Sequence, residues 1–559
     1  MPHRAIIVTA AAAAAVVVWL GLCPVPALDA ADSTWSVDAG GNWSGSLNWD
    51  NHTPPNGPTD VARLTHNISA DTQVTIDAAM GAGVAAMAVF LDDDSHNYTL
   101  ASAGGTLTLR GFIQSDGAGR NHVVAAPVLV SLPITLVAQT ADLTVSGSIS
   151  GPGLDRSVIK DGPCTIFLEG ANTYQGDTTV SDGVLTIRTD TALGATTAGT
   201  EVITGATLAV EHPSGLHVGA EALALSGAGV GGAGALRSLA GDNTWLGQVA
   251  LPTDATIGVN GGSRLALSGG LSCQGALSKV GLGELVLSGT QAYGVGAALV
   301  AAAGTVRMDA DAGGPAGDHN LAVMTMGHAA VQFGSTQHLA ELNLMVGSSR
   351  LAAGGTVLAT ASLLVGPGDS VLDLDDGAMV VDYEDDADPT GDIVGWVRTG
   401  LNREAGGYWD GLGITSSAAA AEADRLTALG VVDNTDPKVG GKTVFRGETV
   451  DATSVLAMYT WWGDANLDGV VDANDYDVID KMFLFTPDPD NMGWWTGDFN
   501  YDGVIDANDY DRIDKAFLFQ TGPLADEAGG AATPTPEPAT LALVALGLGL
   551  ALRRRAGGG

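Results

Sequence analysis

The sequence predicts a mainly β protein that ends in a small helical domain. Across residues 32–381, short runs of alternating apolar and polar residues are separated by Gly, Asn and Asp, for example at 184–188 and 285–288. Period-two alternation with turn residues about every 8–12 positions is typical of short strands. No long helix is predicted in this region, which excludes a doubly wound α/β fold. An internal repeat and a duplicated acidic loop refine this prediction.

The β region repeats itself at a fixed distance. Segment 160–174 aligns with segment 279–293 at a shift of 119 residues (279 − 160 = 119), so that Lys160 matches Lys279. The recurring lysine fits a structural role at a corner of the repeat. The pattern resembles the autotransporter-associated β-strand repeat, which occurs in right-handed parallel β-helices. The resemblance implies a right-handed parallel β-helix, in which successive rungs stack because one rung cannot bury its own apolar face.

A twelve-residue acidic loop occurs twice, at 464–475 and 498–509. Oxygen-bearing side chains stand at loop positions 1, 3, 5, 9 and 12, Gly stands at position 6, and position 7 offers its backbone carbonyl. This is the spacing of EF-hand calcium loops, because Ca²⁺ takes six to eight oxygen ligands. Two acidic turns without metal are the alternative. The predicted ligands of two Ca²⁺ ions are Asp464, Asn466, Asp468, Val470, Asp472 and Asp475, and Asp498, Asn500, Asp502, Val504, Asp506 and Asp509.

Each loop leads into a short amphipathic helix, and the two loop starts lie 34 residues apart (498 − 464 = 34). No entering helix precedes the loops, and position 12 is Asp where an ordinary EF-hand has Glu. Over residues 459–519 the arrangement resembles a type I dockerin domain, which is a small α-helical, paired F-hand calcium domain. The resemblance implies folding on Ca²⁺ and docking onto a cohesin-like or other envelope protein. It also implies partner choice at loop positions 10 and 11, which are Ala473, Asn474, Ala507 and Asn508.

The two identical Ala-Asn pairs suggest two equivalent binding faces. They differ from the hydroxyl pairs that are common at these positions in cellulosomal dockerins.

Both ends of the chain have the pattern of sorting signals. A basic start, an apolar run and small residues predict a secretory signal peptide over residues 1–30. Near the other end, an apolar stretch at 539–552 separates two short motifs, Pro536, Glu537 and Pro538 before it and Arg553, Arg554 and Arg555 after it. This tail resembles the PEP-CTERM sorting signal, whose family is processed at the inner membrane by an exosortase. The resemblance implies export to the cell surface or extracellular matrix after transient inner-membrane anchoring, and a plain membrane anchor is the alternative.

The charge balance limits the classes of partner. Lys and Arg number 24 against 63 Asp and Glu, which gives a formal net charge of −39. A negative field of this size repels nucleic acid and anionic membranes and favours divalent cations, which argues against a nucleic-acid role. The mean hydropathy of +0.20 and the 78 Gly indicate a folded, turn-rich β protein. Cys164 and Cys273 lie outside the leader and form either a disulfide or two separate buried thiols.

No catalytic constellation is found in the sequence. The acidic runs are not acid/base pairs, because consecutive strand residues point to opposite faces, and solvated turns are the better interpretation of Asp92, Asp93 and Asp94 and of Asp373, Asp375 and Asp376. Nucleophile-elbow, P-loop and zinc-type spacings are missing. The Trp pairs at 461–462 and 494–495 predict packing in the core or at a partner interface rather than a glycan-binding platform.

The predicted organisation has five parts. They are a signal peptide at 1–30, the β-helix at 31–381, a cap and linker at 382–450, the dockerin-like domain at 451–525 and the sorting tail at 526–559. Within the cap, the Ala-rich run at 416–429 predicts one short helix.

The combination resembles large exported repeat proteins of planctomycete-type bacteria. The leading interpretation is a non-catalytic exported protein of the cell surface or extracellular matrix, in which a Ca²⁺-dependent docking module sits on a β-helical stalk. One alternative is a polysaccharide-active lyase or hydrolase tethered through its dockerin. Another alternative is an adhesin, and glycans are candidate ligands of the β-helix.

Overall fold

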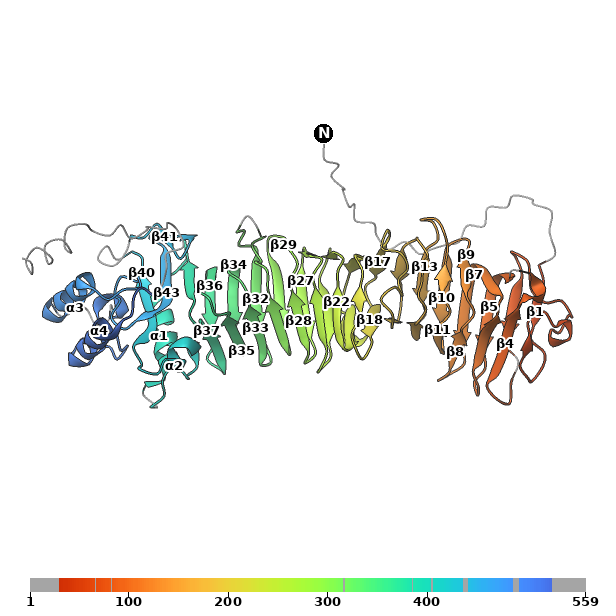
Figure 1. Cartoon of the computed structure of the whole chain (residues 1–559), viewed down its shortest axis with the longest axis horizontal. Helices are drawn as coiled ribbons and strands as arrows, with labels where there is room; N and C mark the ends of the chain where they lie inside the picture. Colours follow the sequence, from red (N-terminus) through yellow and green to blue (C-terminus); the bar gives the residue numbers. More distant parts are fainter. Residues whose placement is uncertain are drawn as a thin grey trace, which may run out of the picture.

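The computed structural model describes residues 30–65, 67–81, 83–314, 317–384, 386–403, 406–435, 441–485 and 492–524. Within them the chain forms an elongated β-solenoid of about 14 turns, with a helical region at its C-terminal end (Figure 1). The predicted fold class is confirmed: a mainly β fold in which a parallel β-helix is followed by a small helical domain. The predicted sorting tail and all but the last residue of the predicted signal peptide lie outside the described residues.

Three rows of parallel strands make the walls of the solenoid. The first row contains, in order of pairing, β1 (Asp32–Thr34), β3 (Val61–Leu64), β5 (Gly83–Asp92), β7 (Thr106–Asp116), β10 (Ile134–Ala138), β13 (Val158–Asp161), β15 (Thr178–Val180), β17 (Gly199–Val202), β20 (Ala222–Leu225), β23 (Val249–Leu251), β26 (Leu271–Cys273) and β29 (Gln291–Tyr293). β9 (Val128–Val130) pairs with β7, and β12 (Ile149–Ser150) pairs with β9.

The second row runs the length of the solenoid. Its parallel strands are β2 (Gly41–Asn42), β4 (Thr72–Asp77), β6 (Tyr98–Ala103), β8 (Asn121–Val124), β11 (Asp142–Val145), β14 (Thr165–Leu168), β16 (Val184–Ile187), β18 (Thr207–Glu211), β21 (Leu236–Ala240), β24 (Ala255–Val259), β27 (Ala276–Val280), β30 (Ala297–Ala301), β32 (Leu321–Thr325), β34 (Gln337–Leu344), β36 (Val357–Val365) and β38 (Ala378–Asp382).

The third row begins midway along the solenoid. Its strands are β19 (His217–Val218), β22 (Asp242–Trp245), β25 (Arg264–Leu267), β28 (Glu284–Leu287), β31 (Thr305–Met308), β33 (Ala329–Phe333), β35 (Gly347–Leu351), β37 (Ser370–Asp373) and β39 (Gly413–Thr415).

The core is a set of aliphatic ladders, because equivalent residues of successive rungs face inward in register. Leu185 pairs with Leu208, which pairs with Leu236 in the next rung, and all three side chains are buried. Neighbouring strands lie about 4.8 Å apart, so each apolar side chain packs on the one above and the one below. At the N-terminal end, edge-to-face contacts among Trp35, Trp43 and Trp49 close the core.

Two lysines interrupt these ladders, and both are fully buried. The Lys160 ammonium group donates to the carbonyl oxygens of Gly162, Cys164 (2.7 Å) and Asp182 (2.6 Å). Two of these carbonyls belong to the lysine's own turn, and the third, that of Asp182, belongs to the following rung. Three acceptors satisfy all three N–H groups, so the structural role predicted for this lysine is confirmed.

The second lysine of the repeat has the same environment. Lys279 donates to the carbonyl oxygens of Gly281 (2.6 Å), Gly283 (2.5 Å) and Ala303 (2.8 Å). Burial lowers the pKa of each lysine to about 8, so both stay mainly protonated at neutral pH. Lys160 lies in the first row and Lys279 in the second, so the sequence repeat reproduces a corner of the solenoid rather than one position in a common sheet.

The C-terminal end of the solenoid is closed by antiparallel pairing. β43 (Ser454–Trp461) pairs antiparallel with β38 on one side and with β40 (Thr427–Asp433) on the other. This reversal of direction ends the stacking of parallel rungs and covers the edge of β38. An uncovered strand edge could pair with another chain and lead to aggregation. β43 was assigned from the sequence to the 451–525 domain, but it belongs to the wall of the solenoid.

The cap differs from its prediction in its helices. α2 (Ser417–Ala421) covers only the start of the Ala-rich run, and β40 occupies its end, because that segment is buried as a strand against β43. A longer helix, α1 (Thr390–Leu401), was not predicted. Its signal was present in the sequence, since Ile393, Val397 and Leu401 recur every four residues and are buried.

A histidine joins the cap to the solenoid wall. His338, on β34, lies between two carboxylates, with Nδ1 2.6 Å from Asp311 and Nε2 2.9 Å from Glu448. Glu448 belongs to the hairpin of β41 (Val444–Phe445) and β42 (Glu448–Thr449). The hydrogen bonds to Asp311 and Glu448 raise the pKa of His338 to about 10, so this side chain is a cation at neutral pH. The ring also stacks on His319.

Both cysteines outside the leader are free thiols in the structure. Cys273 is buried and Cys164 is partly buried. No helix in the described ranges is long and apolar enough to span a membrane.

Replacing either buried lysine that donates to three backbone carbonyls should destabilise the solenoid. Lys160→Met and Lys279→Met each leave three carbonyls without their donor, and we expect each to lower the free energy of unfolding by about 2–4 kcal/mol. Urea unfolding followed by circular dichroism measures this change. The matched control is Lys515→Met, because Lys515 is exposed and pairs only with Asp511. If Lys160→Met and Lys279→Met were both as stable as the wild type, the three hydrogen bonds of each lysine would not stabilise the solenoid.

The His338 contact should make stability depend on pH. A pKa raised from 6.5 to about 10 contributes stability that is fully present below about pH 6.5 and is lost as the pH rises towards 10. We therefore expect His338→Gln to cost about 1–3 kcal/mol at pH 6 and progressively less up to pH 10. Urea unfolding at pH 6, 8 and 10 measures the difference. The facing ionisable groups are Asp311, Glu448, His319 and Asp382. A cost that does not change with pH would show that His338 is not the titrating cation.

Candidate metal centre

The two acidic loops have nearly the same backbone conformation. Each is followed by a helix that starts at loop position 10, α3 (Ala473–Phe485) after the first loop and α4 (Ala507–Phe519) after the second. Gly469 and Gly503, at position 6, have φ values of 84° and 82°, which strain any residue with a Cβ. The sharp turn that the calcium-loop spacing predicts is therefore present in both copies.

The first aspartate of each loop organises the turn. Asp464 accepts hydrogen bonds from the amides of Asp468 (3.1 Å) and Gly469 (2.9 Å). Asp498 accepts the equivalent bonds from Asp502 (3.0 Å) and Gly503 (2.9 Å).

The last aspartate of each loop closes it. Asp475 accepts from the amides of Ala465 and Asp472, both at 2.8 Å, and Asp509 accepts from Asn500 (3.1 Å) and Asp506 (2.9 Å). Each loop therefore folds around its own carboxylates.

Four carboxylates are buried in these loops, and within the described part of the chain no lysine or arginine forms an ion pair with any of them. Asp464, Asp475, Asp498 and Asp509 have no exposed surface. Burial, together with the other carboxylates of the loop, raises the pKa of Asp464 to about 7, that of Asp475 to about 8 and that of Asp509 to about 7, and it also raises the pKa of Asp498. Buried carboxylates with raised pKa values favour a bound cation over the empty loop.

The position-3 residues give a second indication of the fit to a cation. The Oδ1 atom of Asn466 is buried and has no hydrogen-bond partner, so an acceptor oxygen is available in the first loop. In the second loop, Asn500 Oδ1 accepts from the Asp502 amide, and it is Nδ2 that has no partner. An all-oxygen donor set suits Ca²⁺ and does not suit soft metals.

The remaining predicted ligands lie nearer the surface. Asp468, Asp502 and Val504 are exposed, and Val470, Asp472 and Asp506 are partly buried. Across the described ranges, no group of three or more His, Cys, Asp or Glu side chains is arranged to hold a metal ion. The twelve residues therefore match Ca²⁺ in chemistry and loop conformation, while the buried carboxylates bond to loop amides.

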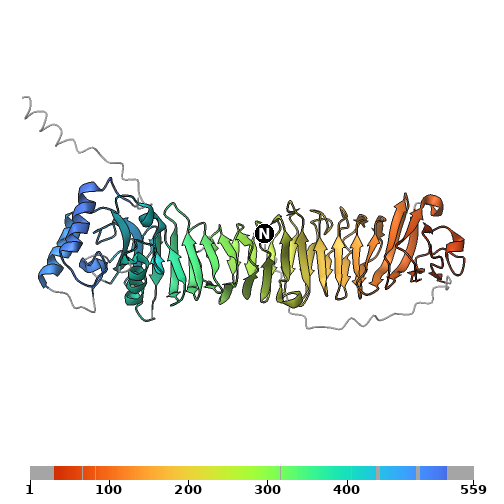
Figure 2. The same cartoon turned by 90° about the horizontal axis from the view of Figure 1, so that it is seen from below.

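The residues at loop positions 10 and 11 lie on α3 and α4, the two helices that also carry exposed aromatic side chains. Ala473, Asn474, Ala507 and Asn508 are all exposed, at the starts of α3 and α4. The two helices lie side by side at the C-terminal end of the molecule (Figure 2). The aromatic residues of these helices were not among the predicted site residues, although they recur in both copies of the 34-residue repeat.

The helices pack through two copies of one contact. Tyr476 meets Phe517 edge to face at 5.8 Å and donates to Asp514 at 2.6 Å. With the helices exchanged, Tyr510 meets Phe483 at 5.8 Å and donates to Asp480 at 2.7 Å. Each contact joins the start of one helix to the end of the other, so α3 and α4 are antiparallel and related by an approximate twofold axis.

The loops are built into the cap of the solenoid. The aromatic rings of Tyr408, Trp409, Trp462, Trp494 and Tyr501 form a continuous row with centroid separations of 6.4, 6.3, 5.8 and 5.7 Å. This row crosses from the cap into the second loop.

Hydrogen bonds strengthen the same junction. Tyr501, at loop position 4, donates to the carbonyl of Leu429 on β40 at 2.8 Å, and Trp494 donates to the carbonyl of Asp464 at 2.6 Å. All four tryptophans of the predicted Trp pairs are at most 6 % exposed. The structure therefore places them in the core, as the sequence predicted.

The acidic runs on the solenoid hold turns through hydrogen bonds and an ion pair, and the prediction that they are solvated is wrong for Asp93 and Asp375, which are buried. Asp373 accepts from the Ser417 amide, Asp375 pairs with Arg350, and Asp376 accepts from the Gly354 amide. In the other run, Asp93 is 4 % exposed and accepts from the amides of Ile68, Ser95 and His96. These carboxylates fix turns of the solenoid.

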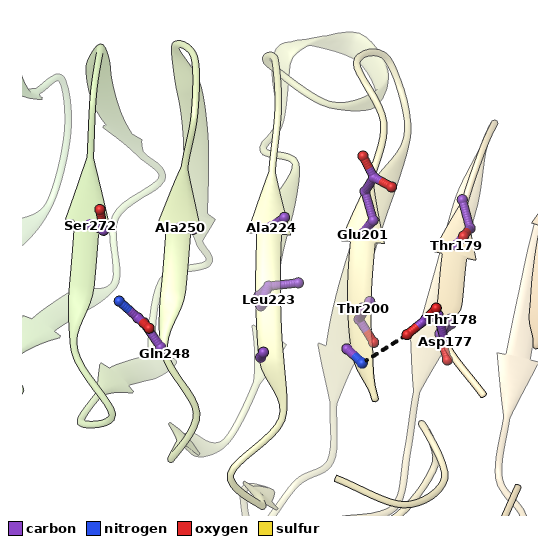
Figure 3. A pocket seen from close by; sticks show the side chains of 12 residues that line it. Asp177, Thr178, Thr179, Thr200, Glu201, Leu223, Ala224, Gln248, Ala250 and Ser272 are labelled. Atoms are coloured by element: carbon purple, nitrogen blue, oxygen red, sulfur yellow. Dashed lines mark hydrogen bonds between the residues drawn. The ribbon is translucent and has the colours of Figure 1, made fainter. Parts of the chain in front are cut away.

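A shallow hollow of about 440 Å³ lies on the first row of strands, over β15, β17, β20, β23 and β26 (Figure 3). Its lining includes the carboxylates of Asp177 and Glu201, but no aromatic ring on which a sugar could stack. Asp177 accepts a hydrogen bond from the Gly199 amide at 3.3 Å. The residues that line the hollow are Asp177, Thr178, Thr179, Gly199, Thr200, Glu201, Ala222, Leu223, Ala224, Gln248, Ala250 and Ser272.

Comparison with protein families gives two matches. Residues 462–518 match the type I dockerin domain, and residues 534–555 match the PEP-CTERM protein-sorting motif, which lies outside the described residues. No curated protein and no solved structure matches the chain. Dockerin domains bind cohesins and are generally calcium-binding, and the PEP-CTERM motif indicates an exported protein that is processed at its C-terminus.

These matches and the β-solenoid confirm the combined architecture that the sequence predicted, a docking module on a β-helical protein. The resemblances to autotransporter-associated repeats and to planctomycete-type proteins stay predictions.

Removing Ca²⁺ should loosen the C-terminal end of the molecule. Without a cation, the buried carboxylates of each loop repel one another, so chelation should expose Trp462 and Trp494 and lower the melting temperature of this end. Tryptophan fluorescence and circular dichroism with Ca²⁺ and with EDTA measure both changes.

Matched variants separate the loops from the helix surfaces. Asp475→Asn combined with Asp509→Asn should abolish the effect of Ca²⁺. Asp477→Asn combined with Asp511→Asn should preserve it, since those two carboxylates are exposed and pair with Lys481 and Lys515. Identical spectra of the wild type in Ca²⁺ and EDTA would contradict calcium binding.

Proposed function

We propose that this chain is an exported, non-catalytic surface protein whose C-terminal module holds a partner protein in a Ca²⁺-dependent manner, with the β-solenoid as its stalk. The observation that carries this proposal is the duplicated, outward-facing surface of α3 and α4. Two ions in the acidic loops would fix the starts of both helices and thereby the shape of that surface.

The docking surface consists of exposed apolar residues at the ends of α3 and α4 together with the loop residues at positions 10 and 11. Phe483, Leu484, Phe517, Leu518 and Phe519 are 48–74 % exposed. Because the helices are antiparallel, these side chains form two groups, one at each end of the helix pair. Groups of large exposed apolar side chains are typical of interaction sites. A hollow of about 420 Å³, lined in part by Ala473, Tyr476 and Phe517, adjoins it and would accept a side chain of the partner.

The charge of the surface limits the partner. Exposed aspartates flank the apolar residues at equivalent positions of the two helices, Asp477 and Asp480 on α3 and Asp511 and Asp514 on α4. An apolar centre with an acidic rim favours a partner, cohesin-like or another envelope protein, with an apolar patch surrounded by Lys and Arg.

The calcium ligands in this proposal are the twelve predicted residues. In each loop the carboxylates of positions 1, 3, 5, 9 and 12 or their Asn equivalents would supply side-chain oxygens, and Val470 and Val504 would supply carbonyls. Bound Ca²⁺ provides the positive charge that the buried carboxylates lack. Export is supported by the match to the sorting motif and by the predicted leader, with processing by an exosortase-type enzyme.

A second candidate function is a polysaccharide-active enzyme. The hollow on the first strand row favours it, because carboxylates and hydroxyl groups line an open trough along the solenoid (Figure 3). Incubation of the chain with a panel of polysaccharides distinguishes the two functions, since release of reducing or unsaturated sugars would overturn the non-catalytic proposal.

Capture of a partner from the envelope fraction of the native organism tests the docking proposal. The bait is residues 30–524, because the module packs into the cap and a shorter fragment would lose those contacts. We expect one partner to be retained in Ca²⁺ and released by EDTA.

Arginine substitutions at position 10 test the two faces. Ala473→Arg and Ala507→Arg should each leave capture largely intact, because the other face still binds, and the double variant should reduce capture at least tenfold. Lys481→Ala is the control on the same helix. Capture that survives in the double variant, or that is equal in EDTA, would contradict docking through this surface.

A further inference from the structure

The two calcium loops differ in what the cap presents to them. Arg403, just after α1, forms an ion pair with Asp502, with Nη1 3.5 Å from Oδ2. Asp502 is the position-5 ligand of the second loop. A cavity of about 430 Å³ lies at this junction, and its lining includes Arg398, Arg403, Asn500 and Asp502. Two arginines of the cap therefore border two predicted ligands of the second loop.

Arg398 adds to the positive charge at this junction. It lies on α1 and lines the same cavity as Asn500 and Asp502. The backbone of Arg398 is fixed because α1 is anchored through Ile393, Val397 and Leu401. The second loop therefore meets positive charge at positions 3 and 5.

The first loop has no such neighbours. Asp468, which is equivalent to Asp502, is exposed, and no lysine or arginine of the described residues forms an ion pair with any carboxylate of the first loop. The Thr460 hydroxyl instead donates to Asp464. The hydrogen bonds inside the two loops differ at two further points: the Ala465 amide donates to Asp475, and Asn500 Oδ1 accepts from the Asp502 amide whereas Asn466 Oδ1 has no partner. The two arginines are the difference in charge between the two sites.

We propose that the two loops bind Ca²⁺ with unequal affinity and that Arg403, supported by Arg398, makes the second loop the weaker site. This inference rests on the proposed calcium binding and adds its regulation. A cation that neutralises Asp502 competes with Ca²⁺ for the same oxygen and also repels the divalent ion. As Ca²⁺ rises, the first loop fills before the second.

The order of filling bears on the junction with the stalk. The second loop is the one whose Tyr501 reaches β40, so its ion is bound at the contact between module and solenoid. At intermediate Ca²⁺ the module would have α3 fixed while the site next to the cap is still empty. The weaker site would then set the calcium concentration at which both docking faces are formed.

Calcium titration of the full chain by calorimetry tests this inference. We expect two binding steps, and we expect Arg403→Gln to tighten the weaker step about threefold to tenfold, because one unit charge close to a divalent ion at a solvent-exposed site is worth that much after screening. Arg398→Gln should have a smaller effect in the same direction. The stronger step should not change in either variant.

Loop variants assign the steps. Asp502→Asn should remove the weaker step, and Asp468→Asn should remove the stronger one. Arg264→Gln is the charge-matched control, because it removes one positive charge from β25 on the solenoid wall, where Arg264 pairs with Asp242. A melting curve of each variant in Ca²⁺ verifies that it is folded.

The outcomes separate this inference from the proposed function. Two equal steps that Arg403→Gln leaves unchanged would overturn the inference and keep calcium binding. Assignment of the weaker step to the first loop would also overturn it, and would mean that burial of Asp464 outweighs the arginines. Absence of any calcium-dependent heat would overturn both.

Discussion

Every rung of this molecule depends on parallel backbone pairing with the rung before and the rung after. That constraint makes the solenoid self-supporting in its middle and vulnerable at its two ends, where a strand edge and an apolar core would meet water. Three buried tryptophans close the first end. At the other end, the antiparallel strand β43 changes the direction of pairing, and the row of aromatic rings behind it covers the core. The region that matches the dockerin family begins at Trp462, directly after the end of β43.

Buried charge is managed by one rule in two parts of the molecule. Within the solenoid, the ammonium groups of Lys160 and Lys279 each meet three carbonyl oxygens, so a cation is stabilised by backbone dipoles. In the acidic loops the signs are reversed, since buried carboxylates meet backbone amides and still carry excess negative charge. Amides satisfy the geometry of a carboxylate but do not cancel its charge. A divalent cation would therefore compensate the remaining negative charge of the loops, whereas the charge of each buried lysine is already stabilised by carbonyl oxygens.

The contacts between the C-terminal module and the solenoid fix the position of α3 and α4. Tyr501 and Trp494 anchor the loops in the cap, so the docking surface of α3 and α4 is held at a fixed place on the end of an elongated body (Figures 1 and 2). A partner bound there would be carried in a defined orientation rather than on a free tether. The same contacts bring the arginines of α1 next to the second loop, which makes two loops of almost equal sequence unequal in their surroundings.

The sequence by itself determined the β architecture, the turn conformation of the two acidic loops and the equivalence of α3 and α4, because period-two alternation, fixed loop spacing and a 34-residue repeat are local properties of the chain. It also indicated the role of the recurring lysine. Only the tertiary structure decided that both cysteines are free, that the Ala-rich run ends in a strand, and that Arg403 reaches Asp502, 99 residues further along the chain (502 − 403 = 99). Those outcomes depend on which distant segments the stacking of rungs brings together, and no local pattern encodes that contact.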